Sequence, residues 1–211
     1  MTFLILKFLE FRFKIWYIEI MGHALPKEKF SVEQYLDLER KSLEKSELIN
    51  GEIYSMTGTT RKHNRIALNL ASYLDNILRT KSCRVYISDL RVHVEKTNLI
   101  TYPDLVITCG EEILRDSYKD TILNPKCIIE ILSESTEKYD RGDKFSHYQK
   151  IESLEEYILV SQDSFKVESF LRSTKETWVY TCLEGIESVL SILSIGEEVS
   201  LRVAYSNTED L

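Results

Sequence analysis

Two strongly apolar segments of the chain each carry one carboxylate. YPDLVITC (102–109) has Asp104 near its start, and PKCIIEILS (125–133) has Glu130 in its middle. An acid inside a buried strand must be protonated, paired, or bound to a cation, because an isolated buried charge is strongly unfavourable. If the two strands are neighbours, the acids converge and repel each other unless a cation lies between them. Mg²⁺ suits this position because it accepts carboxylate oxygens and keeps several waters.

Three other polar residues could take part in the same chemistry. Glu52 in NGEIY could supply a further oxygen ligand. Lys144 in DRGDKF follows the Glu130 segment, where an ammonium could orient a water or stabilise charge on a phosphate. His63 in RKHNR lies among cations and would suit a phosphate.

Each of these residues also has a plainer interpretation. Asp104 could begin its strand with a turn hydrogen bond after Pro103, and Glu130 could pair with a buried Arg or Lys. Lys144 follows Asp140 by four residues, the spacing of a surface ion pair that contributes roughly 0.3–0.5 kcal/mol. An acid beside a turn, such as Glu52, is more often exposed than a ligand, and His63 could simply end a helix.

Length and composition favour one globular domain. The chain has 211 residues, of which 43% are hydrophobic and 29% charged. We expect a single domain over 26–205, an N-terminal appendage over 1–25 and a C-terminal tail over 206–211. The appendage is apolar but interrupted by charges, so it predicts no membrane span. We favour an over-extended start, with Met21 as the natural beginning, over an interfacial helix.

The charge balance limits how the protein could bind a polyanion. The formal net charge is −7, so any nucleic-acid contact must come from a local basic surface. One candidate surface contains a single acid, Asp75, and the basic residues Arg61, Lys62, Arg65, Arg79, Lys81 and Arg84. A solvated helix face is the alternative interpretation.

The four cysteines, Cys83, Cys109, Cys127 and Cys182, are far apart and never form C-x-x-C. This spacing predicts neither a thiolate zinc site nor a redox pair. We expect them to pack mainly as small hydrophobic residues, and their usage favours a cytoplasmic location.

The periodicity of the sequence predicts a mixed α/β or α+β fold, with helices packed on a sheet. A capping box of Ser31 and Gln34 predicts a first helix of about three turns, and Asn50-Gly51 predicts a tight hairpin. We expect further helices over 63–79 and 135–151, the second with Phe145, Tyr148 and Ile151 facing inward. Strands are predicted over 83–95, 102–109, 126–133, 155–162, 166–172 and 177–182, and a loop with one short helical turn over 110–125.

Several blocks of the sequence resemble the Uma-type restriction endonuclease family, long described as a domain of unknown function, within the PD-(D/E)XK nuclease superfamily. The blocks are INGEIYSM, HNRIALNL, RVYISDLRV, YPDLVITC, IIEILSESTEKYDRGDKFSHYQKI and EEYILVSQD, in order from about Phe30 to about Ala204. The resemblance implies a restriction-endonuclease-like core with flanking helices and metal-dependent cleavage of DNA.

The resemblance also implies roles for individual residues. Asp104 and Glu130 correspond to the two acids of the motif, and Glu52 to an N-terminal acidic position. The motif lysine is absent, because Leu132 stands there, and Lys144 on the following helix is the candidate replacement. Mg²⁺, or Mn²⁺ as a substitute, would be held by Asp104, Glu130 and the backbone carbonyl of Ile131 while water attacks the phosphodiester in line. Residues proposed for phosphate contact are Arg61, His63 and Arg65.

Two other functions remain open from the sequence. The acidic net charge and the displaced lysine favour a nuclease-fold binding or regulatory module without catalysis. A metal-dependent hydrolase of another phosphoester is a weaker alternative. The chain lacks a Walker-type loop, H-E-x-x-H and G-x-S-x-G, which argues against a nucleotide triphosphatase, a zinc protease and a serine hydrolase. By resemblance we expect DNA as the partner, a homodimer and no membrane association.

Overall fold

The computed structural model describes residues 29–208, which begin with helix α2 (Val32–Glu39). Its first turn is closed by the predicted capping box. Ser31 Oγ accepts a hydrogen bond from the Gln34 N–H, and Gln34 Oε1 accepts one from the Ser31 N–H at 2.8 Å. The helix is confirmed but has only eight residues, about two turns rather than three.

The Asn50-Gly51 hairpin is also confirmed. It joins β1 (Ser46–Ile49) to β2 (Glu52–Ser55), with Ile49 opposite Glu52. Asn50 and Gly51 have φ angles of 53° and 84°, as a two-residue turn between antiparallel strands requires. The hairpin belongs to a five-stranded sheet in the order β2-β1-β5-β4-β7, completed by β5 (Leu99–Thr101), β4 (Arg91–Val94) and β7 (Thr121–Ile122).

The central sheet has six strands in the order β11-β10-β9-β8-β6-β3. Only β8 and β9 are parallel, and all other neighbours are antiparallel. The strands are β3 (Cys83–Ile87), β6 (Leu105–Cys109), β8 (Cys127–Leu132), β9 (Glu156–Ser161), β10 (Lys166–Arg172) and β11 (Trp178–Glu184).

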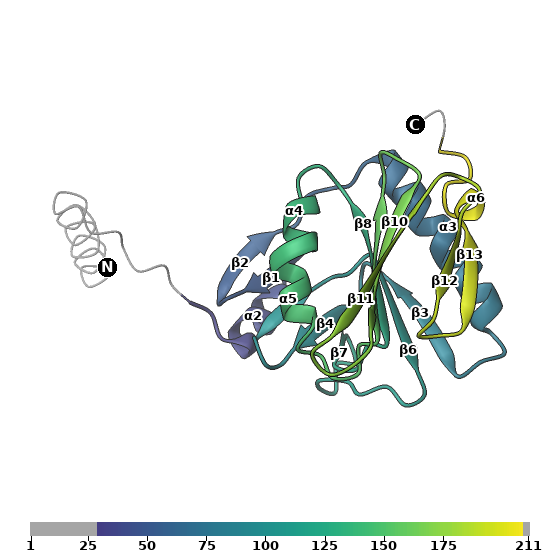
Figure 1. The fold of residues 1–211 in the computed structure, drawn as a ribbon. Coiled ribbons are helices and arrows are strands. Elements are labelled where there is room, and N and C mark those ends of the chain that lie inside the picture. The colour runs from purple at the N-terminus through teal and green to yellow at the C-terminus, as the bar shows by residue number, and fades with distance from the viewer. Residues whose placement is uncertain (1–28, 209–211) are drawn as a thin grey trace, which may run out of the picture.

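Helices cover both faces of this sheet, which explains why its middle strands are almost continuously apolar (Figure 1). On one face lie α3 (Arg61–Leu78), the β12 (Val189–Ile192) and β13 (Glu197–Ser200) hairpin and α6 (Leu201–Ala204). On the other face lies a helical segment made of α4 (Glu137–Tyr139), η1 (Asp140–Lys144) and α5 (Phe145–Tyr148). Phe145, Tyr148 and Ile151 face inward as predicted.

Some predicted elements differ in the structure. Residues 83–95 form two strands in different sheets rather than one half-exposed strand, since the chain turns between β3 and β4. The 110–125 segment contains the short strand β7 and no helical turn. The β12–β13 hairpin and α6 were not predicted. The mixed α+β class itself is confirmed, although the strands divide into more than one sheet.

The expectation for the cysteines is wrong for two of them. Cys83 and Cys109 are opposite each other in the antiparallel pairing of β3 with β6, and they form a disulfide. Cys127 is buried as expected and Cys182 is exposed.

Within residues 29–208, no helix has both the length and the apolar character needed to cross a membrane. The predicted N-terminal appendage lies outside the described residues.

Candidate active site

The two acid-bearing strands are direct neighbours in the central sheet. β6 pairs with β8 so that Leu105 is opposite Ile129, which brings Asp104 and Glu130 together one position further on. The backbone links them closely. The Asp104 N–H donates to Glu130 Oε2 at 3.2 Å, and the Ile131 N–H donates to Asp104 Oδ2 at 2.8 Å.

Lys144 reaches the same point from the helical segment. Its Nζ lies 2.8 Å from Glu130 Oε1, 3.4 Å from Asp140 Oδ1 and 3.9 Å from Glu47 Oε1. Lys144 is only 6% exposed and Glu130 only 3%. The interpretation of Lys144 and Asp140 as a surface ion pair is therefore excluded by their burial.

A π-helical turn positions this lysine. η1 spans Asp140–Lys144, between α4 and α5. Such turns are rare and often mark functional sites, because the extra residue changes which side chains share a face. Here Asp140 and Lys144 both turn inward toward Glu130, while Phe145 and Tyr148 still pack in the core.

The first hairpin contributes an acid to the cavity, but that acid is Glu47 rather than Glu52. Glu47 accepts hydrogen bonds from Thr101 Oγ1 and from the Tyr102 N–H, the latter at 3.1 Å. Glu52 pairs with Ile49 at the turn end of the hairpin and accepts a hydrogen bond from the Tyr54 hydroxyl at 2.9 Å. It does not line the cavity that Glu47 lines.

His63 is buried in the first turn of α3, and its Nε2 lies 3.2 Å from Asp104 Oδ2. The histidine thus contacts an acid. Arg61 and Arg65 are exposed on the same helix, outside the cavity lining.

The distal part of the predicted basic surface is paired with acids. Arg79 pairs with Asp75, Lys81 with Glu197 and Arg84 with Glu112. The six cations therefore do not form one continuous basic track. The other three, Arg61, Lys62 and Arg65, are on the first turns of α3, and the N-cap Thr60 and His63 of this helix line the cavity.

These residues surround a cavity of about 710 Å³. Its outer walls are two hydroxyl-rich loops, 55–60 and 133–136, which are largely exposed and open the cavity to solvent. Polar residues at its base are Glu47, His63, Asp104, Glu130, Asp140 and Lys144.

The base of the cavity carries more acids than cations. Burial, together with the charges of Asp104 and Asp140, raises the pKa of Glu130 to about 8. Burial also raises the pKa of Asp140. Burial alone would lower the pKa of Lys144, but the surrounding carboxylates, Glu130 first, hold that pKa well above its ordinary value. The lysine therefore stays charged.

This donor set fits a hard cation. Within residues 29–208, no three His, Cys, Asp or Glu side chains are grouped as a closed metal site. Mg²⁺ does not require one, because it is usually held by one or two carboxylates, waters and substrate phosphates. Asp104 and Glu130 provide the carboxylates, and a cation beside them would favour the charged form of Glu130 against its burial and the charges of Asp104 and Asp140.

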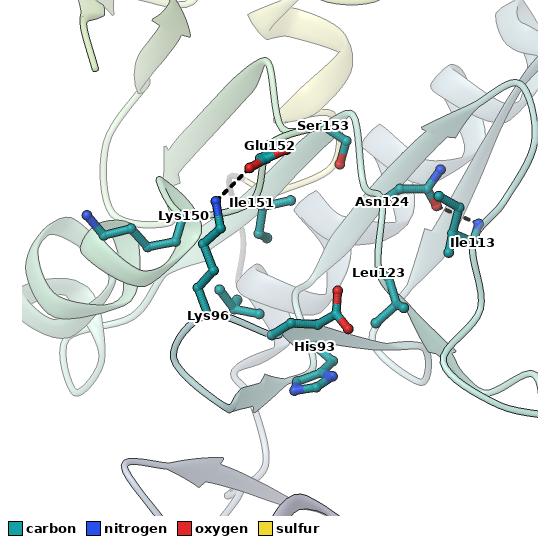
Figure 2. Close-up of a pocket in the computed structure, with 11 residues that line it drawn as sticks. His93, Lys96, Ile113, Leu123, Asn124, Lys150, Ile151, Glu152 and Ser153 are labelled. Carbon is teal, nitrogen blue, oxygen red and sulfur yellow. Dashed lines mark hydrogen bonds and ion pairs between the residues drawn. The ribbon is translucent and has the colours of Figure 1, made fainter. Parts of the chain in front are cut away.

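A second cavity, of about 370 Å³, lies between the end of β4, the loop after β7 and the loop after α5 (Figure 2). Four of its lining residues pair with one another, whereas the buried His93 Nε2 has no hydrogen-bond partner among residues 29–208. Lys96 donates to Glu152 at 2.7 Å, and Asn124 Oδ1 accepts a hydrogen bond from the Ile113 N–H at 2.7 Å. It does not combine buried acids with a buried lysine, so the first cavity is the candidate active site.

Two proteins of Synechocystis sp. (strain ATCC 27184 / PCC 6803 / Kazusa) are similar to this chain along most of their length. "Uncharacterized protein sll1609" is 32% identical over 152 residues, which cover 72% of this chain and 86% of that protein. "Uncharacterized protein slr1290" is 33% identical over 183 residues, which cover 86% and 94%.

A solved structure and a family model complete the comparison. The crystal structure of "a putative nuclease belonging to DUF820" from Anabaena variabilis ATCC 29413 matches with a TM-score of 0.68, over 84% of this chain and 98% of that one. At 19% identity, this likeness shows the fold alone. The model of the Uma2 family, described as "Putative restriction endonuclease", matches residues 32–204. Because the match includes both acid-bearing strands and the lysine-bearing helical turn, the chain belongs to the Uma2 family.

Proposed function

We propose that the protein is a Mg²⁺-dependent endonuclease that hydrolyses phosphodiester bonds of DNA in the cavity around Asp104, Glu130 and Lys144. One observation carries the proposal. Lys144, from a π-helical turn, lies 2.8 Å from Glu130, and Glu130 accepts a hydrogen bond from the Asp104 N–H on the neighbouring strand. Membership of the Uma2 family supports a nuclease activity.

Asp104, Glu130 and the backbone carbonyl of Ile131 are the proposed ligands of the ion. When bound, Mg²⁺ supplies positive charge to the phosphate oxygens and lowers the pKa of a coordinated water. His63, 3.2 Å from Asp104, holds that carboxylate in place. Arg61 and Arg65, exposed on the same helix, are the proposed contacts for flanking phosphates.

Lys144 acts as a fixed positive charge. Because its pKa is held high, the ammonium keeps its proton and cannot serve as a base. It orients the attacking water and stabilises the negative charge that builds up on the phosphoryl group. The water oxygen forms a new bond to phosphorus and releases its proton to solvent, the bond from phosphorus to the leaving sugar oxygen breaks, and that oxygen takes up a proton from solvent.

A binding or regulatory module is the second candidate. The net charge of −7 and Leu132 in place of the motif lysine favour it. The two candidates differ in whether metal-dependent cleavage occurs at all.

The test is cleavage of supercoiled and single-stranded DNA by the purified protein with Mg²⁺ or Mn²⁺. We expect Asp104→Asn and Lys144→Met to lower the rate by about a hundredfold or more. Lys150→Met is the matched control, because Lys150 is exposed and lies six residues further along. Equal cleavage by all variants would point to a contaminant, and no cleavage by the folded parent would favour the binding module.

A further inference from the structure

Tyr139 carries a hydroxyl that has no hydrogen-bond partner among residues 29–208. It is the last residue of α4, and it lines the same cavity as Asp104, Glu130 and Lys144. The Oη atom is fully buried. A buried hydroxyl without a partner is unfavourable, so its presence here indicates that a partner arrives from outside the chain.

Two nearby tyrosines, in contrast, have hydrogen-bond partners for their hydroxyls. Tyr148 donates to Glu130 Oε1 at 2.9 Å, and Tyr157 donates to the backbone carbonyl of Asp140 at 3.1 Å. Both keep the acids and the π-helical turn in position. Tyr139 is adjacent to Asp140 in the chain but makes no comparable bond within the described residues.

The chemistry of the cavity limits what the partner can be. Burial, followed by the charge of Glu47, raises the pKa of Tyr139 above its ordinary value, so the phenol keeps its proton and acts as a donor. The partner must therefore be an acceptor. The acids of the cavity already surround Lys144. The substrate of the proposed reaction brings an acceptor of its own, an oxygen of its phosphate.

We infer that Tyr139 is a catalytic residue whose hydroxyl donates a hydrogen bond to a non-bridging oxygen of the phosphate that is cleaved. The inference rests on the proposed nuclease function and adds a substrate contact to it. A donor placed there stabilises negative charge as it develops on the phosphoryl oxygens. It complements Lys144, which is held by three carboxylates.

The experiment combines Tyr139→Phe, which removes only the hydroxyl, with substitution of sulfur for one oxygen of the phosphate. The bond that the parent cuts is first mapped on a natural oligonucleotide, and each phosphorothioate diastereomer is then placed at that bond. Single-turnover rates are measured in Mn²⁺, which tolerates sulfur better than Mg²⁺ does. Tyr86→Phe is the matched control, because its hydroxyl donates to Glu112 outside the cavity.

We expect Tyr139→Phe to slow cleavage of the natural phosphate by about 10- to 100-fold. Removing one hydrogen-bond donor to a transition state typically lowers the rate by this factor or by a slightly larger one. We also expect one diastereomer to slow the parent but to slow Tyr139→Phe no further, since the bond to that oxygen is already lost. Tyr86→Phe should behave like the parent with every substrate.

The outcomes separate this inference from the proposed function. If the parent cleaves DNA and Tyr139→Phe matches Tyr86→Phe, the tyrosine contact is refuted and the nuclease stands. Sulfur effects that are the same in parent and Tyr139→Phe would likewise refute the phosphate contact. If the folded parent cleaves no DNA in either metal, the proposed function is refuted, and this inference is refuted with it.

Discussion

At the scale of single residues, the candidate site contains one buried lysine, which comes from a π-helical turn. The family motif expects that lysine two positions after Glu130, but Leu132 stands there and packs with Phe145 in the core. Lys144 reaches Glu130 from the helical segment that covers the same face of the sheet. An ammonium thus contacts Glu130 from an element other than β8, and β8 is entirely apolar apart from its acid.

Glu47 and Glu52 provide a matched pair for testing the hairpin's contribution. Glu47 lies 3.9 Å from Lys144 Nζ, whereas Glu52 lies at the turn end of the same hairpin, outside the cavity lining. We expect Glu47→Gln to lower the cleavage rate by about tenfold or more, because it removes one of the charges that hold the ammonium. Glu52→Gln should change the rate less than about twofold.

Rates would be measured with plasmid DNA in Mg²⁺ for both variants, beside thermal unfolding to check the fold. Glutamine can still accept the hydrogen bonds from Thr101 and Tyr102, so the hairpin should stay in place. A larger effect from Glu52→Gln than from Glu47→Gln would show that the hairpin acts in another way.

The sequence identifies some of these residues better than others. Asp104 and Glu130 are visible because an acid inside an apolar run requires an explanation. Glu47 is hidden in a short segment of mixed polarity, and its role depends on how the hairpin packs against β5. The available signal was that Glu47 alternates with Leu48, whose side chain is buried on the other face of the strand. Tyr139 had no signal, since the π-helical turn that places it cannot be predicted from periodicity.

At the scale of elements, the π-helical turn contains a glycine that does not need to be glycine. A Cβ added at Gly142 would meet no atom within 4 Å, and its φ is not positive. Glycine inside a helix costs roughly 0.5–1 kcal/mol relative to alanine. We therefore expect Gly142→Ala to stabilise the protein by about that amount, measured as the free energy of unfolding in urea.

Gly110 is the control for this substitution. A Cβ there would also meet no atom within 4 Å, but its φ is +78°, which alanine adopts only with strain. Gly110→Ala should therefore destabilise the protein, although the space around the two glycines is equally open. If Gly142→Ala were also destabilising, the backbone of the π-helical turn would be less helix-like than the structure indicates.

Elements that are determined by residues close together in the sequence could be predicted, whereas those that depend on distant parts of the chain could not. The Ser31–Gln34 capping box and the Asn50-Gly51 turn are closed by residues within a few positions, and both are confirmed. The break between β3 and β4 has no glycine or proline to mark it, so one strand was expected where the chain changes sheets. The Cys83–Cys109 disulfide follows from the register of β3 against β6, which depends on residues 26 apart.

At the scale of the whole molecule, a sheet covered by helices on both faces leaves several ionisable groups buried far from the candidate site. His93 is one of them. It lies on β4 beside the second cavity and is only 3% exposed (Figure 2). Its Nδ1 lies 2.9 Å from Arg115 Nη1, and because a guanidinium can only donate, this nitrogen must be the acceptor of a neutral ring.

Protonation of His93 should therefore oppose folding in mild acid. Burial, followed by the charge of Arg115, lowers the pKa of His93 to about 4, whereas a histidine in an unfolded chain titrates near 6.5. Between these pH values the unfolded chain binds more protons than the folded one, so the stability contributed by the neutral ring is present above about pH 6.5 and is lost as the pH falls toward 4.

We expect the free energy of unfolding of the parent, taken relative to that of His93→Asn at the same pH, to decrease from about pH 6.5 to about pH 4. Asparagine can accept the hydrogen bond from Arg115 but does not titrate. Urea unfolding at several pH values would measure both proteins, and only the slopes are compared, because the substitution also changes packing. The carboxylates, including Glu130 with its pKa raised to about 8, contribute alike in both proteins, so the difference between the slopes isolates the histidine. Identical slopes would mean that His93 is already protonated, or accessible to protons, in the folded state.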